Sequence, residues 1–511
     1  MTRLFRAAFY IAIGLLLVSC SRMPDLTSAT AVSVPPRLDP DYTSLVIPPN
    51  IAPLNFRIKE DGLDYVVKIS SDTTPPLELH CPKGTCQIPL KAWRKMLDNN
   101  KGKHLYYDVY AKKQDGTWVQ FERITNTVAR ETIESYIVYR LLIPNKRTSW
   151  VKGIFQRNLE TFERSPLMTL RDGTVGCHNC HTFHQHNPDK FLFHVRMRQA
   201  GMLIVMDGKA RKINTRQDPM FRPLAYSSWH PDGLHIAATM NQFLGYTPSS
   251  EKLYYFEAVE KRGDLVVYNV KSNSISTTRA VFDNKYIETH PCWSPDGRYI
   301  YFVRSTDKPL RLLKDLAAFR FDLMRISHDT ATGTWGSPET VMAYSDLGTS
   351  CAFPRPSPCG RYILHILSDK TTYPIHQRSS DVYVLDLESK QYRRLDNVNS
   401  DLSESYPRWS SNGRWFSFVS NRRDGLSALP YLAYFDEQGQ AHKAFVLPQK
   451  NPAYYDTFID TYNVVELVKS KVNISLFKLA SALQRKPVEA NFPNPPQVDA
   501  YTGATRAPPG H

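Results

Sequence analysis

A five-residue turn motif recurs through the second half of this 511-residue chain. Successive copies lie about 43 to 64 residues apart, and each is followed by a strand-like run. Proline presets φ and glycine accepts a positive φ, so each copy predicts a tight turn between two strands. Repeats of this length, with four short strands each, predict the blades of a β-propeller. The clear copies span 229–233, 293–297, 356–360 and 409–413, and a weaker copy begins at Asn187.

The repeats predict a propeller over 187–470 with five recognisable blades. Cys359 and Asn412 replace the turn aspartate in two copies. The motifs resemble the TolB-type, WD-like propeller repeat, which implies a fold and not a function. Propellers with this repeat often close with six blades. A sixth blade would have to include a C-terminal strand such as 461–468; if it does not, the sixth blade does not exist.

The segment before the repeats predicts a second β domain. Short strand-like runs separated by turns indicate a β-sandwich over 51–146, similar to immunoglobulin or fibronectin modules. A helical turn is expected at 92–97, and apolar spacing in 148–163 predicts a helix within the connecting segment 147–186. The chain is therefore expected to be all-β, with a sandwich followed by a propeller. The strand-like runs are 54–58, 65–69, 77–80, 104–110, 118–121 and 136–142.

The N-terminus predicts export and lipid attachment. Arg3 and Arg6 precede an apolar run of about ten residues, which has the length of a signal peptide and is too short to span a bilayer. The run ends in Leu-Val-Ser-Cys, which resembles the lipobox of bacterial lipoproteins and implies cleavage after residue 19 and lipidation of Cys20. Ser21 after that cysteine implies the outer membrane of the cell envelope rather than the inner one. Residues 20–50, rich in Pro, Ser and Thr, are expected to be a tether.

The net charge of +15 favours anionic partners. Export makes nucleic acid an unsuitable partner. The expected partners are therefore periplasmic redox proteins or other envelope proteins. The N-terminal lipid is expected to attach the chain to the membrane. Export also permits disulfides, and Cys81 and Cys86 flank a turn sequence that could close a small one. Residues 471–511 are expected to form a C-terminal tail.

The chemistry of the chain is concentrated at 177–181, where Cys-His-Asn-Cys-His matches the attachment motif of c-type haem. In this interpretation Cys177 and Cys180 form thioethers to one covalent haem c, and His181 is the proximal iron ligand. Two alternatives remain open: another metal site, with His178, His184 and His186 as further donors, and a plain disulfide. Aligned with the other copies, the motif stands where each blade has its first strand, which lines the channel.

The sixth iron ligand is not fixed by the sequence. His290 aligns with Tyr226 and Tyr406 at the start of an inner strand, and His194 aligns with Phe302 and His365 in a core-like strand position. Either histidine could bind iron, which would suit electron transfer; an open site would suit small-ligand chemistry instead.

The combination of lipobox, single Cys-x-x-Cys-His and propeller repeats resembles exported proteins labelled as cytochrome c or cytochrome c biogenesis proteins. It is distantly similar to the hydrazine synthase alpha subunit, whose family carries more than one haem motif per alpha chain, so hydrazine synthesis is not implied.

Three functions follow. One is a monohaem cytochrome that transfers electrons and docks through its propeller, and another is a haem enzyme or sensor with an open iron site. The third is a TolB-like scaffold for envelope proteins or glycans without redox activity. No catalytic residue can be named, because the sequence contains no Gly-x-Ser-x-Gly, phosphate-loop or His-Glu-x-x-His motif.

Overall fold

The structure, a computed structural model, is built almost entirely of antiparallel β-sheet. The short helices are α2 (Leu90–Asn99), α3 (Leu476–Gln484) and the 3-10 turns η1 (Pro82–Gly84), η2 (His184–His186), η5 (Tyr344–Leu347), η6 (Pro374–His376) and η7 (Tyr454–Asp456). It describes residues 23–143, 150–169, 177–196, 200–216, 223–248, 256–283, 285–306, 319–370 and 373–496. Cys20 and the signal segment lie outside these ranges. No helix in the described ranges is both long and apolar enough to cross a bilayer.

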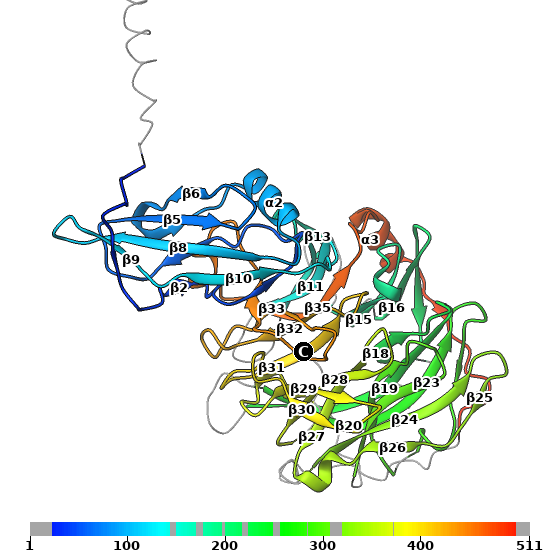
Figure 1. Ribbon diagram of the computed structural model, residues 1–511. Helices are drawn as coiled ribbons and strands as arrows, with labels where there is room; N and C mark the ends of the chain where they lie inside the picture. Colours follow the sequence, from blue (N-terminus) through cyan, green and yellow to red (C-terminus); the bar gives the residue numbers. More distant parts are fainter. Residues whose placement is uncertain are drawn as a thin grey trace, which may run out of the picture.

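Two sheets near the N-terminus pack into the predicted sandwich (Figure 1). Phe56 of the smaller sheet lies 6.4 Å, ring to ring, from Tyr107 of the larger sheet, and both are buried. The larger sheet contains β1 (Thr30–Ala31), β3 (Val46–Ile47), β5 (Asp64–Ser70), β6 (Leu77–His80), β8 (His104–Lys112), β9 (Trp118–Gln120) and β10 (Ile124–Val128); the smaller contains β2 (Leu38–Asp39), β4 (Phe56–Ile58) and β7 (Thr85–Cys86).

The predicted tether over 20–50 is wrong for its described part. Strands β1, β2 and β3 place this segment in both sheets of the sandwich, and Tyr42 and Leu45 are buried. The Asn126 side chain accepts the Leu45 N–H and donates to the Tyr42 carbonyl, which secures the segment to β10. The Pro-, Ser- and Thr-rich composition of this segment did not indicate that Tyr42 and Leu45 would be buried.

A helix and a disulfide complete the sandwich. Trp93, Met96 and Leu97 fall on one face of α2 at helical spacing and are buried. The Trp93 Nε1–H donates to the Ile51 carbonyl at 3.0 Å. Cys81 and Cys86 are joined by a disulfide across the η1 turn, and both are fully buried.

Six sheets in the described part of the chain form the blades of a propeller. We number them I to VI in the order of their innermost strands. Blade I contains β14 (Cys177–Phe183), β15 (Lys190–Arg196), β16 (Gly201–Met206) and β17 (Lys209–Asn214); blade II contains β18 (Leu224–Trp229), β19 (His235–Pro248), β20 (Phe256–Asn269) and β21 (Ser274–Ser276).

The remaining blades follow the same plan. Blade III contains β22 (Glu288–Trp293), β23 (Tyr299–Ser305), β24 (Phe321–Asp329), β25 (Thr334–Trp335) and β26 (Glu339–Met342); blade IV contains β27 (Ser350–Pro356), β28 (Tyr362–Ser368), β29 (Asp381–Asp386) and β30 (Tyr392–Arg394); blade V contains β31 (Glu404–Trp409), β32 (Trp415–Ser420), β33 (Leu429–Tyr434) and β34 (Phe445–Val446); blade VI contains β35 (Thr461–Val468), β11 (Tyr136–Ile143), β12 (Trp150–Asn158) and β13 (Arg164–Thr169).

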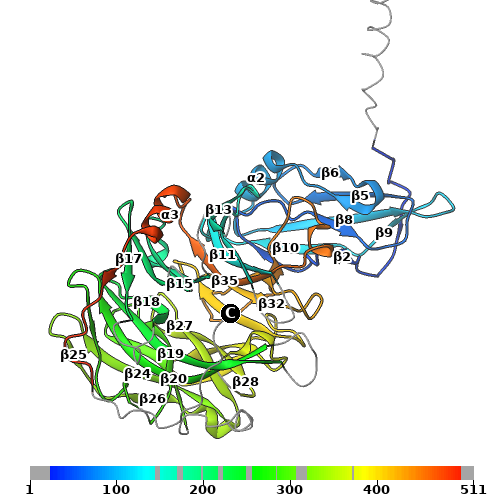
Figure 2. The same cartoon turned by 180° about the vertical axis from the view of Figure 1, so that it is seen from behind.

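Blade VI combines two distant parts of the chain, as Figures 1 and 2 show. Its innermost strand β35 follows blade V, so the expectation that 461–468 supplies a sixth blade is confirmed. Its other three strands precede blade I. The run 136–142 therefore belongs to the propeller and not to the sandwich. The helix predicted at 148–163 is wrong, because β12 occupies most of that range and β13 begins directly after it. Strand β12 pairs on both sides, and this sheet context overrides the helical spacing of its apolar residues.

The six innermost strands form a closed ring. Each of β14, β18, β22, β27, β31 and β35 contacts the innermost strands of both neighbouring blades. The recurring turns have the predicted geometry: Gly297, for example, has a φ of +74°. A Cβ at this position would lie 2.3 Å from Nε2 of His230, which donates to the Gly297 carbonyl at 3.1 Å. Glycine is therefore needed here for both conformation and space.

The predicted C-terminal tail is partly ordered. Helix α3 buries Leu479 and Leu483 against blade I. Ser475 caps this helix, its Oγ accepting the Lys478 N–H. Beyond it β36 (Val488–Glu489) adds a parallel strand to the outer edge of blade I, and Phe492 is buried against Phe282 of blade II.

The sandwich is fastened to blade V and to the loop that follows it. The Tyr42 hydroxyl donates to the Val446 carbonyl, and Arg423 forms ion pairs with Asp39 and Asp456. Several independent contacts of this kind hold one domain against the other.

Candidate functional site

The innermost strands of all six blades carry a bulge at one equivalent place. In β18 the pairing with the second strand shifts between Ala225 and Ser228, and corresponding shifts occur in β14, β22, β27, β31 and β35. A bulge redirects the side chains beside it, so equivalent residues form layers around the channel. In blades II to VI the bulge holds a non-glycine residue with a φ between 47° and 56°: Tyr226, His290, Phe353, Tyr406 and Val464.

Four of these bulge residues form an aromatic layer. The ring of His290 lies 4.4 Å from that of Tyr226 and 4.0 Å from that of Phe353, centroid to centroid. Phe353 lies 4.5 Å from Tyr406 in turn. His290, Phe353 and Tyr406 are buried, so blades II to V are joined by ring stacking at this level.

The residues that resume the pairing after each bulge form a second layer, which we call the polar ring. Its members touch their neighbours: the Ser228 hydroxyl lies 3.8 Å from the Cys292 sulfur, and Nε2 of His181 lies 3.9 Å from Oε2 of Glu466. Polar groups in buried strands are costly unless they find partners. The polar ring, one residue from each blade, consists of His181, Ser228, Cys292, Arg355, Arg408 and Glu466.

His181 is the member of the polar ring that belongs to the haem motif. It is 2% exposed, and neither ring nitrogen has a hydrogen-bond partner among the described residues. Burial, together with the charges of Arg408 and Arg140, lowers the pKa of His181 to about 3. The imidazole is therefore neutral at physiological pH, and neutral imidazole is the form that binds metals.

The rest of the motif is described only in part. Strand β14 begins at Cys177, which confirms that the motif supplies the innermost strand of blade I. Cys180 lines the same cavity as His181. The side chains of Cys177, His178 and Asn179 lie outside the described residues.

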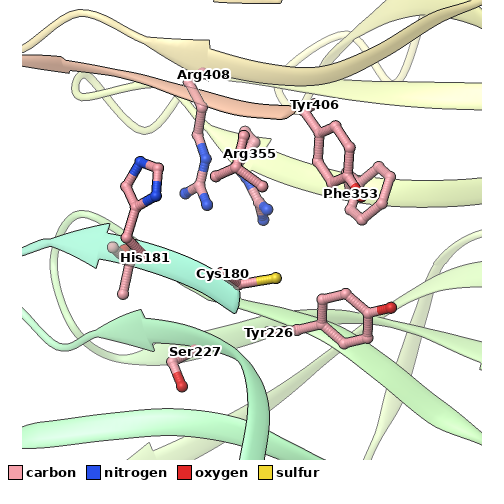
Figure 3. Close-up of a pocket in the computed structure, with 10 residues that line it drawn as sticks. Cys180, His181, Tyr226, Ser227, Phe353, Arg355, Tyr406 and Arg408 are labelled. Carbon is pink, nitrogen blue, oxygen red and sulfur yellow. The ribbon is translucent and has the colours of Figure 1, made fainter. Parts of the chain in front are cut away.

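A small cavity lies among the innermost strands of blades I, II, IV, V and VI (Figure 3). Its volume is about 20 Å³, which is room for one or two water molecules. The guanidinium groups of Arg355 and Arg408 point into it beside Cys180. Its lining consists of Cys180, His181, Thr182, Tyr226, Ser227, Phe353, Arg355, Tyr406, Arg408 and Val464.

The donor set fits a c-type haem, but the space does not. A neutral buried histidine with unpartnered nitrogens, one residue after a cysteine, is the required ligand chemistry. The cavity, however, is far smaller than a porphyrin. The Cys180 thiol and the His181 imidazole also point in different directions from β14 (Figure 3). A haem would therefore require the start of β14 to take another position.

The two candidates for a sixth ligand lie behind residues that line this cavity. His290 is fully buried in the aromatic layer, and its Nδ1 accepts the Phe353 N–H at 3.3 Å. His194 is buried in β15 and hydrogen-bonded through Nε2 to the Ser227 hydroxyl at 2.9 Å. Neither histidine lines the cavity that contains His181.

Of the histidines considered for the alternative metal site, His184 and His186 are engaged elsewhere, and the side chain of His178 lies outside the described residues. His184 donates from Nε2 to the Pro231 carbonyl, and His186 donates from Nδ1 to the Leu467 carbonyl. These bonds fasten the turn after β14 to blades II and VI.

Buried histidines predict a stability that declines in acid. His365, the blade IV equivalent of His194, is fully buried, and burial lowers its pKa to about 4. The unfolded chain binds this proton near pH 6.5, so the stability from the neutral ring is present above that pH and is lost between pH 6.5 and 4. Blades III and V carry phenylalanine at this position, at Phe302 and Phe418.

Between pH 7 and pH 4 we expect the unfolding free energy of His365→Phe to fall less than that of the wild type, by up to about 3 kcal/mol. Urea unfolding at both values measures this. His442→Phe, at a part-exposed position, is the control. An equal pH dependence in His365→Phe and the wild type would contradict the assignment.

Sequence reasoning missed Arg355, Arg408 and Glu466. A signal was present for the two arginines: each stands directly before a copy of the turn motif, and a charged residue in a strand with buried neighbours is unusual. The bulge that aims these side chains into the channel has no sequence signature of its own, so the alignment could not say that they meet.

No protein-family model matches the chain, and no curated protein matches it. Solved propeller structures do resemble it in part. They include oligogalacturonate lyase from Vibrio parahaemolyticus (12% identity, 66% of this chain and 100% of that one, TM-score 0.33). They also include an auxiliary nutrient binding protein from Bacteroides thetaiotaomicron (10%, 81% and 99%, TM-score 0.32) and the β-propeller domain of the Trilobed protease from Pyrococcus furiosus (10%, 67% and 82%, TM-score 0.32). At these scores no function is transferred, and the chain is described by its own sheets as a β-propeller with an N-terminal β-sandwich.

Proposed function

We propose that this chain is an exported, lipid-anchored c-type cytochrome that uses its propeller as a docking platform. The observation that carries the proposal is His181, a buried and neutral imidazole with two unpartnered nitrogens in the polar ring. It follows Cys180 in the only Cys-x-x-Cys-His of the sequence. Lipidation at Cys20 would hold the protein at the envelope membrane, outer rather than inner, where periplasmic redox or envelope proteins are its partners and nucleic acid is not.

The residues have distinct roles in this proposal. Cys177 and Cys180 would hold one haem c covalently, and His181 would be its axial ligand. When bound, the haem supplies a one-electron redox centre. The low pKa of His181 keeps the imidazole neutral at neutral pH, so that one of its two nitrogens carries no proton and can bind a metal. The rings of Tyr226, Phe353 and Tyr406 exclude water on one side of the cavity.

Covalent haem is the direct test. The mature chain is produced with a cytochrome c maturation system, beside a Cys177→Ala/Cys180→Ala variant. We expect haem staining on a denaturing gel and a c-type pyridine haemochrome spectrum at about one haem per chain, with both lost in the variant. Cys292→Ala, which removes a different thiol of the polar ring, should leave the stain unchanged. A folded wild-type chain without covalent haem would sink the proposal.

The closed packing around His181 favours a second candidate. Because the cavity is far smaller than a porphyrin, the structure is also compatible with a binding or scaffold protein whose propeller acts without a redox group. The same experiment separates the two, since a scaffold protein folds without haem and carries no stain.

A further inference from the structure

Arg355 and Arg408 occupy equivalent positions in the neighbouring blades IV and V. Each is the residue that resumes strand pairing after the bulge, in β27 and β31. Both guanidinium groups line the cavity, and Figure 3 shows them pointing into the same space. Two like charges side by side in a protein interior repel each other, so an arrangement of this kind needs a compensating negative group.

The hydrogen-bonding capacity of the pair is incompletely used. Arg355 is only 9% exposed, and its Nη1 donates to the Pro354 carbonyl at 2.8 Å. The Nε–H of Arg355 and the Nε–H of Arg408 have no partner among the described residues. Burial and the charge of Arg408 lower the pKa of Arg355 to about 10, so it stays charged at neutral pH.

The surroundings supply too little negative charge. Glu466 is the acidic member of the polar ring, and its Oε1 already accepts the Phe183 N–H at 3.1 Å. A third guanidinium, that of Arg140, donates to Oδ1 of the Asn463 side chain at 2.7 Å. In this part of the channel, therefore, positive charge exceeds negative charge.

We propose that Arg355 and Arg408 form a carboxylate-binding site inside the propeller channel. A planar carboxylate accepts paired N–H bonds from guanidinium groups, and it would satisfy the two unpartnered Nε–H groups and balance the charge. The cavity has room for a carboxylate as small as formate. Tyr226 and Tyr406 line it as neutral hydroxyls, because burial raises the pKa of each, and so they add no competing charge.

The carboxylate is a small free one, and its binding does not depend on haem attachment.

Formate binding to the haem-free chain is the first test. The full mature Cys177→Ala/Cys180→Ala chain is dialysed to equilibrium against ¹⁴C-formate at constant ionic strength in sodium HEPES. We expect one saturable site per chain. Arg355→Met and Arg408→Met should each weaken binding at least about tenfold, and Arg408→Lys, which keeps the charge but loses the planar fork, should weaken it less. Arg414→Met, at an arginine paired with Glu437 on the surface, should bind as the parent chain does.

Far-UV circular dichroism confirms that each variant is folded, and Arg408→Lys remains informative if a methionine variant is not. Absence of saturable formate binding in the folded parent chain, or equal affinity in the arginine variants, overturns the proposal.

The formate result on the haem-free chain decides this inference whether or not haem attaches, so its failure and the failure of the proposed function are distinguishable.

Discussion

A chain that ends at Asp460 will not form a closed propeller. The truncation removes β35, the innermost strand of blade VI, whose eight residues are all buried. Tyr462, Val465 and Leu467 each stabilise the fold by about 1.5–3 kcal/mol through burial alone. The whole strand therefore contributes an amount comparable to the entire net stability of a typical domain, about 5–15 kcal/mol. We expect loss of the cooperative unfolding transition and strong binding of a hydrophobic dye.

Two longer truncations serve as matched controls. A chain ending at Asn473 keeps β35 but loses α3 and β36, and we expect it to fold with reduced stability. A chain ending at Phe492 keeps every buried C-terminal contact described above and should unfold like the full chain. A cooperative transition in the Asp460 chain equal to that of the Asn473 chain would show that β35 does not close the ring.

Trp415→Ala will destabilise the protein by about 3–5 kcal/mol. Trp415 is fully buried in β32, and its Nε1–H donates to the Glu131 carbonyl at 3.0 Å. Tyr434 packs against the same indole at 4.9 Å and donates to the Glu131 carboxylate. One side chain thus joins blade V to the segment between the sandwich and blade VI, and its removal leaves a cavity and an unpaired carbonyl.

Chemical denaturation measures the loss. Trp415→Phe, which fills most of the cavity but cannot donate, should cost less than Trp415→Ala. Trp118→Ala, in the partly exposed strand β9, is the matched control and should change the unfolding free energy by less than about 1 kcal/mol. Similar values for Trp415→Ala and Trp118→Ala would mean that the contact with Glu131 does not couple the domains.

The repeats made most of the propeller predictable, because its turns have a residue-level cause. Proline, as at 295, fixes its φ, and glycine, as at 297, accepts the positive φ that the turn requires; the recurrence of this pair indicated the blades and their order. Blade VI could be foreseen only at β35. Its outer strands lie far from β35 in sequence and carry no turn motif, and apolar spacing in β12 imitated a helix. Pairing with neighbouring strands decides whether such a segment becomes a strand or a helix, and the spacing of its apolar residues does not identify those neighbours.

The candidate site was likewise predictable only in part. The position of Cys180 and His181 on the innermost strand followed from the register of the repeats. The meeting of His181 with Arg408 and Glu466 did not, because it depends on the bulges that turn residues of separate blades toward one centre. The bulges here occur at non-glycine residues such as Tyr406. No particular residue type at these positions predicts a bulge from the sequence.

The division of blade VI between two ends of the propeller also sets an order of events during synthesis. Strands β11 to β13 leave the ribosome nearly three hundred residues before β35 does. At about 5–20 residues per second this is a delay of roughly 15–60 s. Throughout it, the edge of β11 that will pair with β35 has no native partner. A newly made chain therefore carries an open β edge until its last blade arrives, and protection of that edge becomes a requirement for correct folding.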